Sequence, residues 1–238
     1  MEQFIGEVIG TALLVIFGDG AVAAVVLNKS KAQNSGWIVI TTGWAMGLAV
    51  AVYAVGSISG AHLNPAVTVA LAVTGKFAWG SVPAYVAAQM AGALLGAIVV
   101  WLAYLAHWGE TADAGLKLAV FSTGPAIRRN PHNLITEAIG TAVLVFGILA
   151  IVANTAAAQS GLTPLLIGLL LWGIGISLGA PTGYALNPAR DLAPRIAHAI
   201  LPIPGKGSSD WEYSWVPVVG PILGGVVGAL AYVGCLAK

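Results

Sequence analysis

The sequence has few charged residues. Only 8% of its 238 residues are Asp, Glu, Lys or Arg, whereas a typical soluble domain carries about 25%. The hydrophobic share is 58%, and the mean hydropathy is +0.89. These values exclude an ordinary soluble enzyme and indicate a chain that spans a lipid bilayer. The formal net charge is only +1 and no basic arm is present, so nucleic acid is not expected as a partner.

Cysteine is almost absent. Cys235 is the single copy, which excludes an intrachain disulfide and a multi-cysteine metal site. No second ligand accompanies His62 in the sequence, and no nucleophile lies beside a base. We therefore expect no metal, no cofactor and no catalytic residue.

The sequence does contain apolar runs long enough to cross a bilayer. Six full spans are expected, at residues 4–27, 36–55, 81–105, 132–153, 162–180 and 215–236. Two shorter runs, 64–74 and 187–199, have about half the length that a spanning helix needs. The longest polar loop is expected at 107–131. The pattern predicts an all-α membrane protein with six transmembrane helices and two re-entrant half-helices.

The two halves of the sequence are similar to each other. Residues 5–15, IGEVIGTALLV, align with residues 135–145, ITEAIGTAVLV. An identical Asn-Pro-Ala phrase occupies residues 64–66 and 187–189. Because each half holds three spans, the second copy must lie upside down relative to the first. The broken helices of such inverted repeats meet near the membrane midplane and build the functional site.

We accordingly expect one transmembrane domain over residues 1–238. Repeat one covers about 1–106 and repeat two about 132–238. Glycines four residues apart, such as Gly92/Gly96 and Gly224/Gly228, are expected to let these helices cross closely.

Each Asn-Pro-Ala phrase has the composition of a helix start. Asn is a favoured N-cap, and Pro suits the first helical position because its missing N–H has no partner there. Asn64 and Asn187 should therefore lie at helix N-termini, which carry unpaired N–H donors and a partial positive charge. Each side-chain oxygen can cap its helix while the NH₂ group donates to a passing solute.

The segments before these phrases are irregular backbone at membrane depth, which is tolerated only where it lines a cavity. Their carbonyl oxygens are expected to form a ladder of acceptors along a pore. The ladder residues are Gly60, Ala61, His62, Gly183, Tyr184 and Ala185.

Glu7 and Glu137 are ionisable residues inside spans, at matching positions of the two repeats. A proton relay is one interpretation, because ionisable residues in membranes are usually functional. The matched positions favour a scaffold instead, in which each carboxylate accepts N–H donors from a re-entrant loop. Asp19 aligns with Leu149 and is assigned no role in the site.

The paired Asn-Pro-Ala phrases, their spacing and the repeat resemble the aquaporin family over essentially the whole chain. Asp191, which follows the second phrase, resembles the residue that aquaglyceroporins carry at this position. Among the bacterial members of that branch, the chain is most similar to the glycerol facilitators. We assign Asp191 to the loop scaffold with Glu7 and Glu137. The resemblance implies a six-helix bundle whose half-helices meet at their tips, and a homotetramer with one pore in each subunit.

The resemblance also implies a selectivity filter near the outer mouth, formed here by Trp44, Gly175, Tyr184 and Arg190. Most glycerol facilitators carry Phe where this chain has Tyr184. Two aromatic walls and one guanidinium make an amphipathic slot, in which carbon lies against the rings and hydroxyl groups bond to Arg190. Considered alone, Trp44 could instead be an interfacial residue, because Trp is common there.

The resemblance implies a multi-pass protein of the cell membrane with both termini in the cytoplasm. Charge does not support this orientation, because cytoplasmic loops are usually the basic ones. The outer cations would be Lys29, Lys31, Lys117, Arg128, Arg129 and Lys206, and the inner ones Lys76 and Lys238.

The expected function is a passive channel for glycerol and other small uncharged solutes, with water, that excludes ions and protons. A water-selective channel is one alternative, against which Asp191, Gly175 and the lack of a filter His argue. A coupled secondary transporter is another, because it shares the inverted repeat, but it requires an ion-binding or titratable site on the pore path.

Overall fold

The computed structural model describes residues 1–236, so Lys238, counted above among the inner cations, lies outside the described residues. Within this range every regular element is a helix, which confirms the all-α class. The elements are α1 Glu2–Val26, α2 Trp37–Ser59, α3 Pro65–Val73, the 3-10 turn η1 Trp79–Ser81, α4 Val82–Ala103, α5 Leu105–Trp108, α6 Ala114–Phe121, α7 Asn130–Ala153, α8 Thr155–Ser160, α9 Thr163–Ser177, α10 Pro188–Ile200 and α11 Val216–Cys235.

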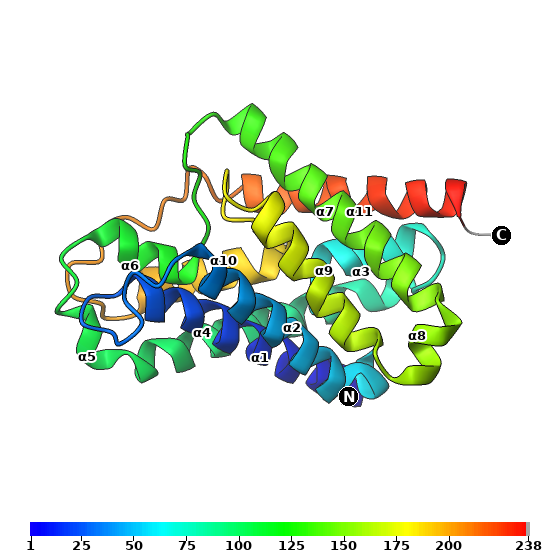
Figure 1. Cartoon of the computed structure of the whole chain (residues 1–238), viewed down its shortest axis with the longest axis horizontal. Helices are drawn as coiled ribbons and strands as arrows, with labels where there is room; N and C mark the ends of the chain where they lie inside the picture. Colours follow the sequence, from blue (N-terminus) through cyan, green and yellow to red (C-terminus); the bar gives the residue numbers. More distant parts are fainter. Residues whose placement is uncertain (237–238) are drawn as a thin grey trace.

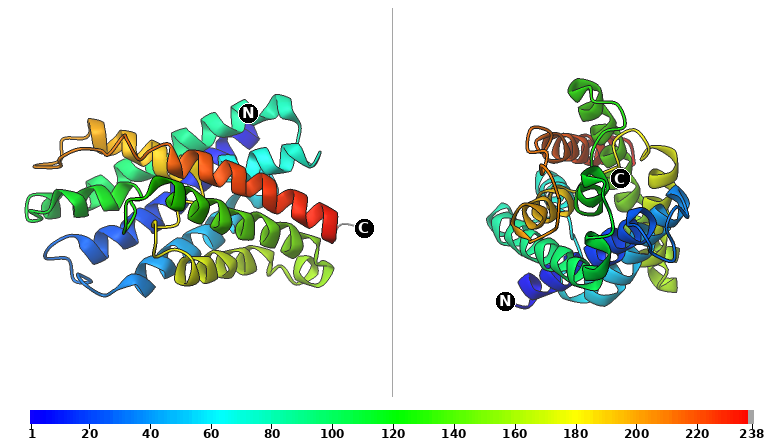
Figure 2. Two further views of the ribbon diagram at one scale, coloured as in Figure 1. Left: turned by 90° about the horizontal axis from the view of Figure 1, so that it is seen from above. Right: turned by 90° about the vertical axis from the view of Figure 1, so that its left-hand side faces the viewer.

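The long helices form a bundle, and the half-helices α3 and α10 enter it from opposite ends (Figure 1). The most extensive pairings are α7 with α11 and α1 with both α2 and α4. Seen along its length, the bundle has helices on all sides (Figure 2, right). The two chain ends lie toward the same end of the bundle.

Five helical segments in residues 1–236 are long and apolar enough to cross a membrane: α1, α2, η1 with α4, α7 and α11. The sixth expected span, 162–180, is shorter than predicted, because α9 has only 15 residues. It ends at Ser177, and the carbonyl oxygen of Gly179 then accepts from the N–H groups of Thr182 and Gly183. This turn begins the second re-entrant loop and removes the last residues of the expected span.

Two expected boundaries were wrong. The span expected to end at residue 55 is helical as far as Ser59, and α2 ends only where Gly60 adopts a left-handed φ of 81°. The polar loop predicted at 107–131 contains α6, because the Asp113 side chain caps the N–H groups of Gly115 and Leu116. Val120 and Phe121 of α6 are buried, so packing against the bundle stabilises a helix that hydropathy alone does not indicate.

The glycine pairs allow the predicted close crossings. A Cβ atom at Gly92 would lie 2.3 Å from the carbonyl oxygen of Val8, and one at Gly96 would lie 2.7 Å from that of Ala12. On α11, the corresponding distances are 2.0 Å from Gly224 to Ala138 and 2.2 Å from Gly228 to Ala142. No side chain fits at these crossings, so the backbones of the paired helices are in direct contact.

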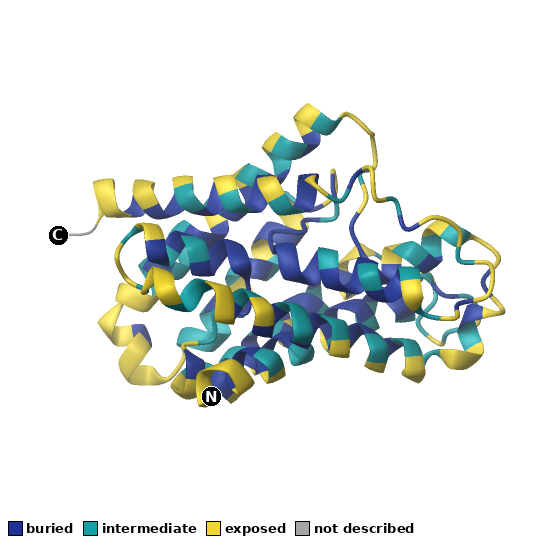
Figure 3. Cartoon of the chain, turned by 180° about the vertical axis from the view of Figure 1, so that it is seen from behind, coloured by how far each residue is buried: buried dark blue, intermediate teal, exposed yellow. Residues whose placement is uncertain are grey.

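The interior of the bundle holds the buried residues, and its outer faces carry the exposed ones (Figure 3). Many of the exposed residues are large and apolar. The exposed residues on these faces include Ile9, Leu95, Ile139, Val227 and Leu230, each about half exposed. Apolar patches of this extent are expected where a protein meets lipid or another subunit.

Gly224→Ala tests the α7–α11 crossing. The added methyl group would overlap the Ala138 carbonyl, so the two helices must separate, at an expected cost of about 1–3 kcal/mol. A lower thermal unfolding midpoint in detergent is the expected result. Gly234→Ala is the matched control on the same helix, because nothing lies within 4 Å of the new atom. The unfolding midpoint of Gly234→Ala should equal or exceed that of the unmodified protein. Equal midpoints for Gly224→Ala and Gly234→Ala would contradict the packing account.

Candidate functional site

The two half-helices begin at Asn64 and Asn187, and their starts are joined by crossed hydrogen bonds. The Asn64 Oδ1 atom accepts from the Ala66 N–H at 2.8 Å, which caps α3. The Asn187 Oδ1 atom accepts from the N–H groups of Ala189 and Arg190, which caps α10. Both side chains therefore act as the N-caps that the sequence predicts.

The NH₂ group of each Asn reaches the opposite loop. Asn64 Nδ2 donates to the Leu186 carbonyl at 2.8 Å, and Asn187 Nδ2 donates to the Leu63 carbonyl at 2.7 Å. Since an amide NH₂ has two hydrogens, each group keeps one donor after this bond. Asn64 and Asn187 line the same cavity, so both remaining donors can serve a molecule inside it.

Glu7 holds the first re-entrant loop in place. Its Oε1 atom accepts from the Ser59 hydroxyl and the His62 N–H, and its Oε2 atom accepts from the Leu63 N–H. Oε2 also accepts from Gln89 Nε2 at 2.7 Å. The carboxylate is fully buried, and both of its oxygens are bonded to donors.

Glu137 makes the corresponding contacts in the second half. Its Oε1 atom accepts from the Thr182 hydroxyl and the Ala185 N–H, and its Oε2 atom accepts from the Leu186 N–H. Ser59 and Thr182 occupy equivalent positions before the two phrases. These contacts favour the scaffold interpretation of both glutamates over a proton relay.

The two loops share an unusual backbone. Gly60 and Gly183 have φ angles of 81° and 82°. The non-glycine residues Ala61, Leu63, Tyr184 and Leu186 are also left-handed, with φ between 40° and 54°. Each such residue costs roughly 1–2 kcal/mol, and the bonds to the glutamates hold the loops in this form. The conformation turns successive carbonyl oxygens away from regular partners.

The carbonyl ladder predicted from the sequence is unpaired. Among residues 1–236, no donor bonds to the carbonyl oxygens of Gly60, Ala61, His62, Gly183, Tyr184 or Ala185. A carbonyl without a protein partner can accept a hydrogen bond from water or from a polar solute. The His62 ring itself packs in the loop, with Nδ1 3.1 Å from the Thr68 hydroxyl and the ring edge against Phe77.

Three adjoining cavities follow these loops through the bundle. The first is lined by Gly183, Tyr184, Trp44 and Arg190, and the last three also line the second, central cavity. The central cavity shares His62 with the third, which is lined further by Gly60 and Ala61. Shared lining residues make the cavities successive parts of one path.

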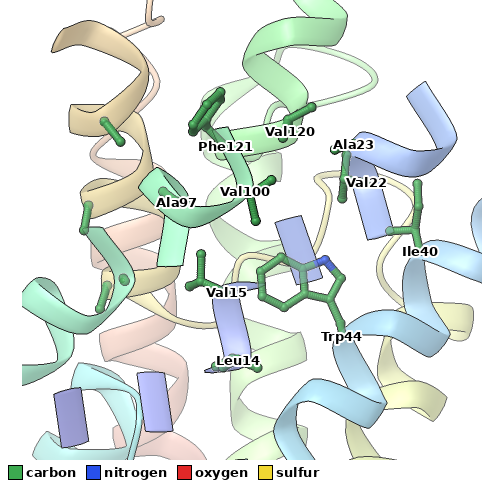
Figure 4. Packing of buried hydrophobic residues seen from close by; sticks show 14 of the residues in the cluster. Leu14, Val15, Val22, Ala23, Ile40, Trp44, Ala97, Val100, Val120 and Phe121 are labelled. Atoms are coloured by element: carbon green, nitrogen blue, oxygen red, sulfur yellow. The ribbon is translucent and has the colours of Figure 1, made fainter. Parts of the chain in front are cut away.

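Three of the predicted filter residues, Trp44, Tyr184 and Arg190, converge where the first cavity meets the central one. The Arg190 guanidinium carbon lies 3.9 Å from the centre of the Trp44 ring, a cation–π contact. Tyr184 lines the same two cavities, and all three side chains are at most 6% exposed. Figure 4 shows the Trp44 ring packed among Val15, Val100 and other residues of the apolar core. Trp44 therefore faces the interior of the bundle.

The absence of a side chain at Gly175 leaves space for the Tyr184 ring. A Cβ atom there would lie 3.1 Å from the Tyr184 ring and 3.0 Å from Thr41. Trp37 contacts both Gly175 and Tyr184. Its Nε1 donates to the Gly175 carbonyl at 2.9 Å, and its ring meets the Tyr184 ring edge-on. Gly175 thus lies against the Tyr184 ring. The contacts of Trp37 were not predicted from the sequence.

Asp191 connects the outer loops to α10. Its Oδ2 atom accepts from the N–H and the hydroxyl of Thr123, and its Oδ1 atom accepts from Nε and Nη2 of Arg195. Arg195 continues to the carbonyl oxygens of Thr123 and Ser209. This buried ion pair joins the loops that carry Thr123 and Ser209 to α10.

Several residues of this framework were missed in the sequence. Gln89, the lone amide of an apolar span, also donates to Thr68. Arg195 lies four residues after Asp191, a spacing that places both on one helix face and could have indicated the pair. The aligned hydroxyls of Ser59 and Thr182 were a similar signal, since both precede a phrase by the same number of residues.

Comparison with known proteins gives consistent matches over nearly the whole chain. Residues 1–232 match the family described as Major intrinsic protein. The probable glycerol uptake facilitator protein of Thermotoga maritima is 62% identical over 232 residues, covering 98% of both chains. The glycerol uptake facilitator protein of Bacillus subtilis is also 62% identical, covering 98% of this chain and 84% of that protein.

A solved structure agrees with these relatives. The X-ray structure of the aquaglyceroporin from Plasmodium falciparum superposes with a TM-score of 0.85 at 31% identity. The match covers 98% of this chain and 96% of the other. The described helices therefore have the arrangement of a known channel fold.

Glu137→Gln tests the loop scaffold. The amide keeps the length of the side chain, but its NH₂ group cannot accept a hydrogen bond from a loop N–H. The loss of one buried hydrogen bond costs about 1–3 kcal/mol. We expect a lower thermal unfolding midpoint in detergent. Glu212→Gln changes an exposed carboxylate and serves as the control. A Glu137→Gln midpoint equal to that of the control would contradict the scaffold role.

Proposed function

Because the chain belongs to the major intrinsic protein family, the aquaporins, we propose that it is a passive transmembrane channel for glycerol and other small uncharged solutes, with water. The observation that carries this proposal is the amphipathic constriction formed by Trp44, Tyr184 and Arg190. Relatives that are 62% identical bear the name glycerol uptake facilitator, which supports the same solute.

The chemistry of the constriction suits a polyol. Glycerol has a carbon backbone and three hydroxyl groups, so it needs an apolar surface and hydrogen-bond partners at the same time. The rings of Trp44 and Tyr184 offer the apolar walls. The Arg190 guanidinium, which is bonded to no other side chain of residues 1–236, offers donors, and the unpaired carbonyls of the loops offer acceptors.

The central donors continue this path. Asn64 and Asn187 each keep one N–H for a hydroxyl or water oxygen, after capping a helix and bonding to the opposite loop. Replacement of a solute's water hydrogen bonds by protein bonds keeps the cost of dehydration low. A neutral polyol can therefore move from the filter through the centre to the inner carbonyls without a large barrier.

For charged species, the same path presents an electrostatic barrier. Two helix N-termini point toward the centre, each with about half a positive charge, and Arg190 adds a full charge near the outer mouth. Positive dipole ends together with a pore arginine exclude protons and cations. A water held by both Asn donors presents its oxygen to each of them, so it cannot accept a hydrogen bond from its neighbour. The chain along which a proton would move is interrupted there.

The alternatives fit the site less well. A water-selective channel requires a narrower filter, whereas Gly175 leaves the Tyr184 ring room to lie back from the path. A coupled transporter requires a free ion-binding group. The carboxylates of Glu7 and Glu137 are bonded to loop donors on both oxygens, so neither is available for that purpose.

The assembly that we propose is a homotetramer in the cell membrane, with one pore in each subunit and both termini in the cytoplasm. The large apolar side chains exposed on the outer faces support contact with lipid and with neighbouring subunits. The chain ends lie toward one end of the bundle (Figure 2). The two units of the pore are the repeats at about 1–106 and 132–238. The matched glutamate contacts of the two loops support this division.

Stopped-flow light scattering on proteoliposomes tests the proposed function directly. A glycerol gradient across vesicles that contain the protein should relax much faster than across empty vesicles, and the rate should rise linearly with gradient. A flux that saturates or that needs an ion gradient would favour a coupled transporter. Fast water flux with no glycerol flux would favour the water-selective alternative.

Gly175→His tests the filter assignment. The imidazole must either displace Tyr184 or enter the path, so glycerol permeability should fall by about tenfold or more while water permeability falls less. Gly173→His, on the same helix where nothing lies within 4 Å of an added Cβ, is the control and should leave both unchanged. Unchanged glycerol flux in correctly inserted Gly175→His protein would refute the filter.

Proton exclusion is a separate prediction. In vesicles with fast glycerol flux, the decay of a pH gradient should not accelerate as more protein is reconstituted. Asn187→Asp removes one donor and adds a negative charge, so a cation leak should appear in that variant. Proton leak that rises with the amount of unmodified protein would show that the charge barrier is wrongly assigned.

A further inference from the structure

Trp37, the first residue of α2, has a side chain next to the proposed filter, although it is not one of the predicted filter residues. It lines the first cavity together with Tyr184, Trp44 and Arg190. Its indole makes two specific contacts, a hydrogen bond to the Gly175 carbonyl and a ring contact with Tyr184. Both contacts bear on the position of the Tyr184 ring.

No side-chain hydrogen bond holds the Tyr184 ring. Its hydroxyl is buried and has no hydrogen-bond partner among residues 1–236. Its backbone has a left-handed φ of 40°, a strained conformation that persists only where the surroundings determine it. The ring packs against α9 at two glycines, since a Cβ atom would lie 3.1 Å from the ring at Gly175 and 2.6 Å from it at Gly179. The place of the ring therefore depends on the end of α9 and on the side chains around it.

The end of α9 carries a carbonyl that the backbone does not satisfy. The helix ends at Ser177, and no backbone N–H among residues 1–236 bonds to the Gly175 carbonyl. Such unpaired carbonyls are general at helix C-termini and need a partner from elsewhere. The Trp37 Nε1 atom supplies it at 2.9 Å, so the start of α2 is fastened to the end of α9.

The same indole packs against the Tyr184 ring. The two ring centroids are 5.6 Å apart and the ring planes are inclined at 72°, which is the edge-to-face geometry that aromatic pairs favour. In the part of the chain that the structure describes, this is the one aromatic pair that includes Tyr184. A single side chain therefore contacts the ring and also fixes the helix end against which the ring packs.

We propose that Trp37 is a positioning residue for the filter, which holds the Tyr184 ring in place and thereby sets the largest solute that passes. This inference rests on the proposed filter. A wall selects by size only where packing behind it keeps it from yielding. Tyr184 lines both the first and the central cavity, so a ring without this support yields to a larger polyol. Glycerol, which passes without displacing the ring, gains less from the change.

The test measures the permeability of erythritol, a polyol with four carbons, relative to that of glycerol by stopped-flow light scattering. A rigid pocket discriminates against one extra carbon about 10- to 200-fold, so partial loss of rigidity should raise this ratio at least about threefold in Trp37→Leu. Trp37→Phe keeps an aromatic ring for Tyr184 and removes only the donor to Gly175, so its rise should be smaller. Trp211→Leu changes an exposed Trp in the loop before α11 and should leave the ratio unchanged.

A double-mutant cycle separates this role from a general structural one. In a Tyr184→Leu background there is no ring to hold, so adding Trp37→Leu should change the ratio by less than about twofold. In a Tyr184→Phe background, which lacks only the unpartnered hydroxyl, Trp37→Leu should keep its full effect. An equal effect of Trp37→Leu in the Tyr184→Leu background and in the unmodified protein would overturn the proposal. So would an unchanged ratio in the single Trp37→Leu variant.

Two further comparisons complete the design. If Trp37→Leu does not insert stably, Trp37→Phe takes its place in the same cycle, with a rise of at least about twofold for the loss of one hydrogen bond. If Gly175→His blocks glycerol while the Trp37 variants leave the ratio unchanged, the filter stands and only the role of Trp37 fails. If Gly175→His also has no effect, the filter itself is wrongly assigned.

Discussion

The structure depends on one constraint, that a backbone inside a bilayer must find partners for its polar groups or face a cavity. The N–H groups just before each Asn-Pro-Ala phrase have no backbone partner, because left-handed residues break any regular pattern. Glu7 and Glu137 accept these N–H groups instead, with both oxygens of each carboxylate engaged. The donors of the loops are thereby bound to the scaffold, and the carbonyls on the other side remain free.

This division of donors and acceptors creates the path. Each loop leaves its carbonyls without protein partners and places an Asn in the central cavity. The crossed bonds of the two Asn side chains to Leu63 and Leu186 join the two halves. The site has polar groups along the loops and apolar side chains elsewhere, a pattern that matches a polyol with hydroxyls on one side and carbon on the other. Arg190 and the two helix N-termini add positive charge, which explains how a path for neutral solutes can exclude cations.

Much of this could be predicted because the decisive signals are local. Asn followed by Pro specifies a helix start, and matched glutamates in repeated spans indicate a common partner in repeated loops. The contacts that escaped prediction join residues far apart in sequence. Trp37 bonds to Gly175, and Arg195 reaches loop carbonyls. Helix α6 was missed because it is stabilised by the burial of Val120 and Phe121. A helix of eight residues is too short for a hydrophobic periodicity to indicate that burial.

The central claim is that the loops leave donors and acceptors along one path that a polyol occupies. A high-resolution structure of the protein equilibrated with glycerol measures this directly. One glycerol oxygen should lie about 3 Å from the Nδ2 atoms of both Asn64 and Asn187. A second molecule should bond to Arg190 with its carbons against Trp44 and Tyr184. A central cavity that holds no polar solute or water, with both Nδ2 atoms bonded only to protein, would contradict the account.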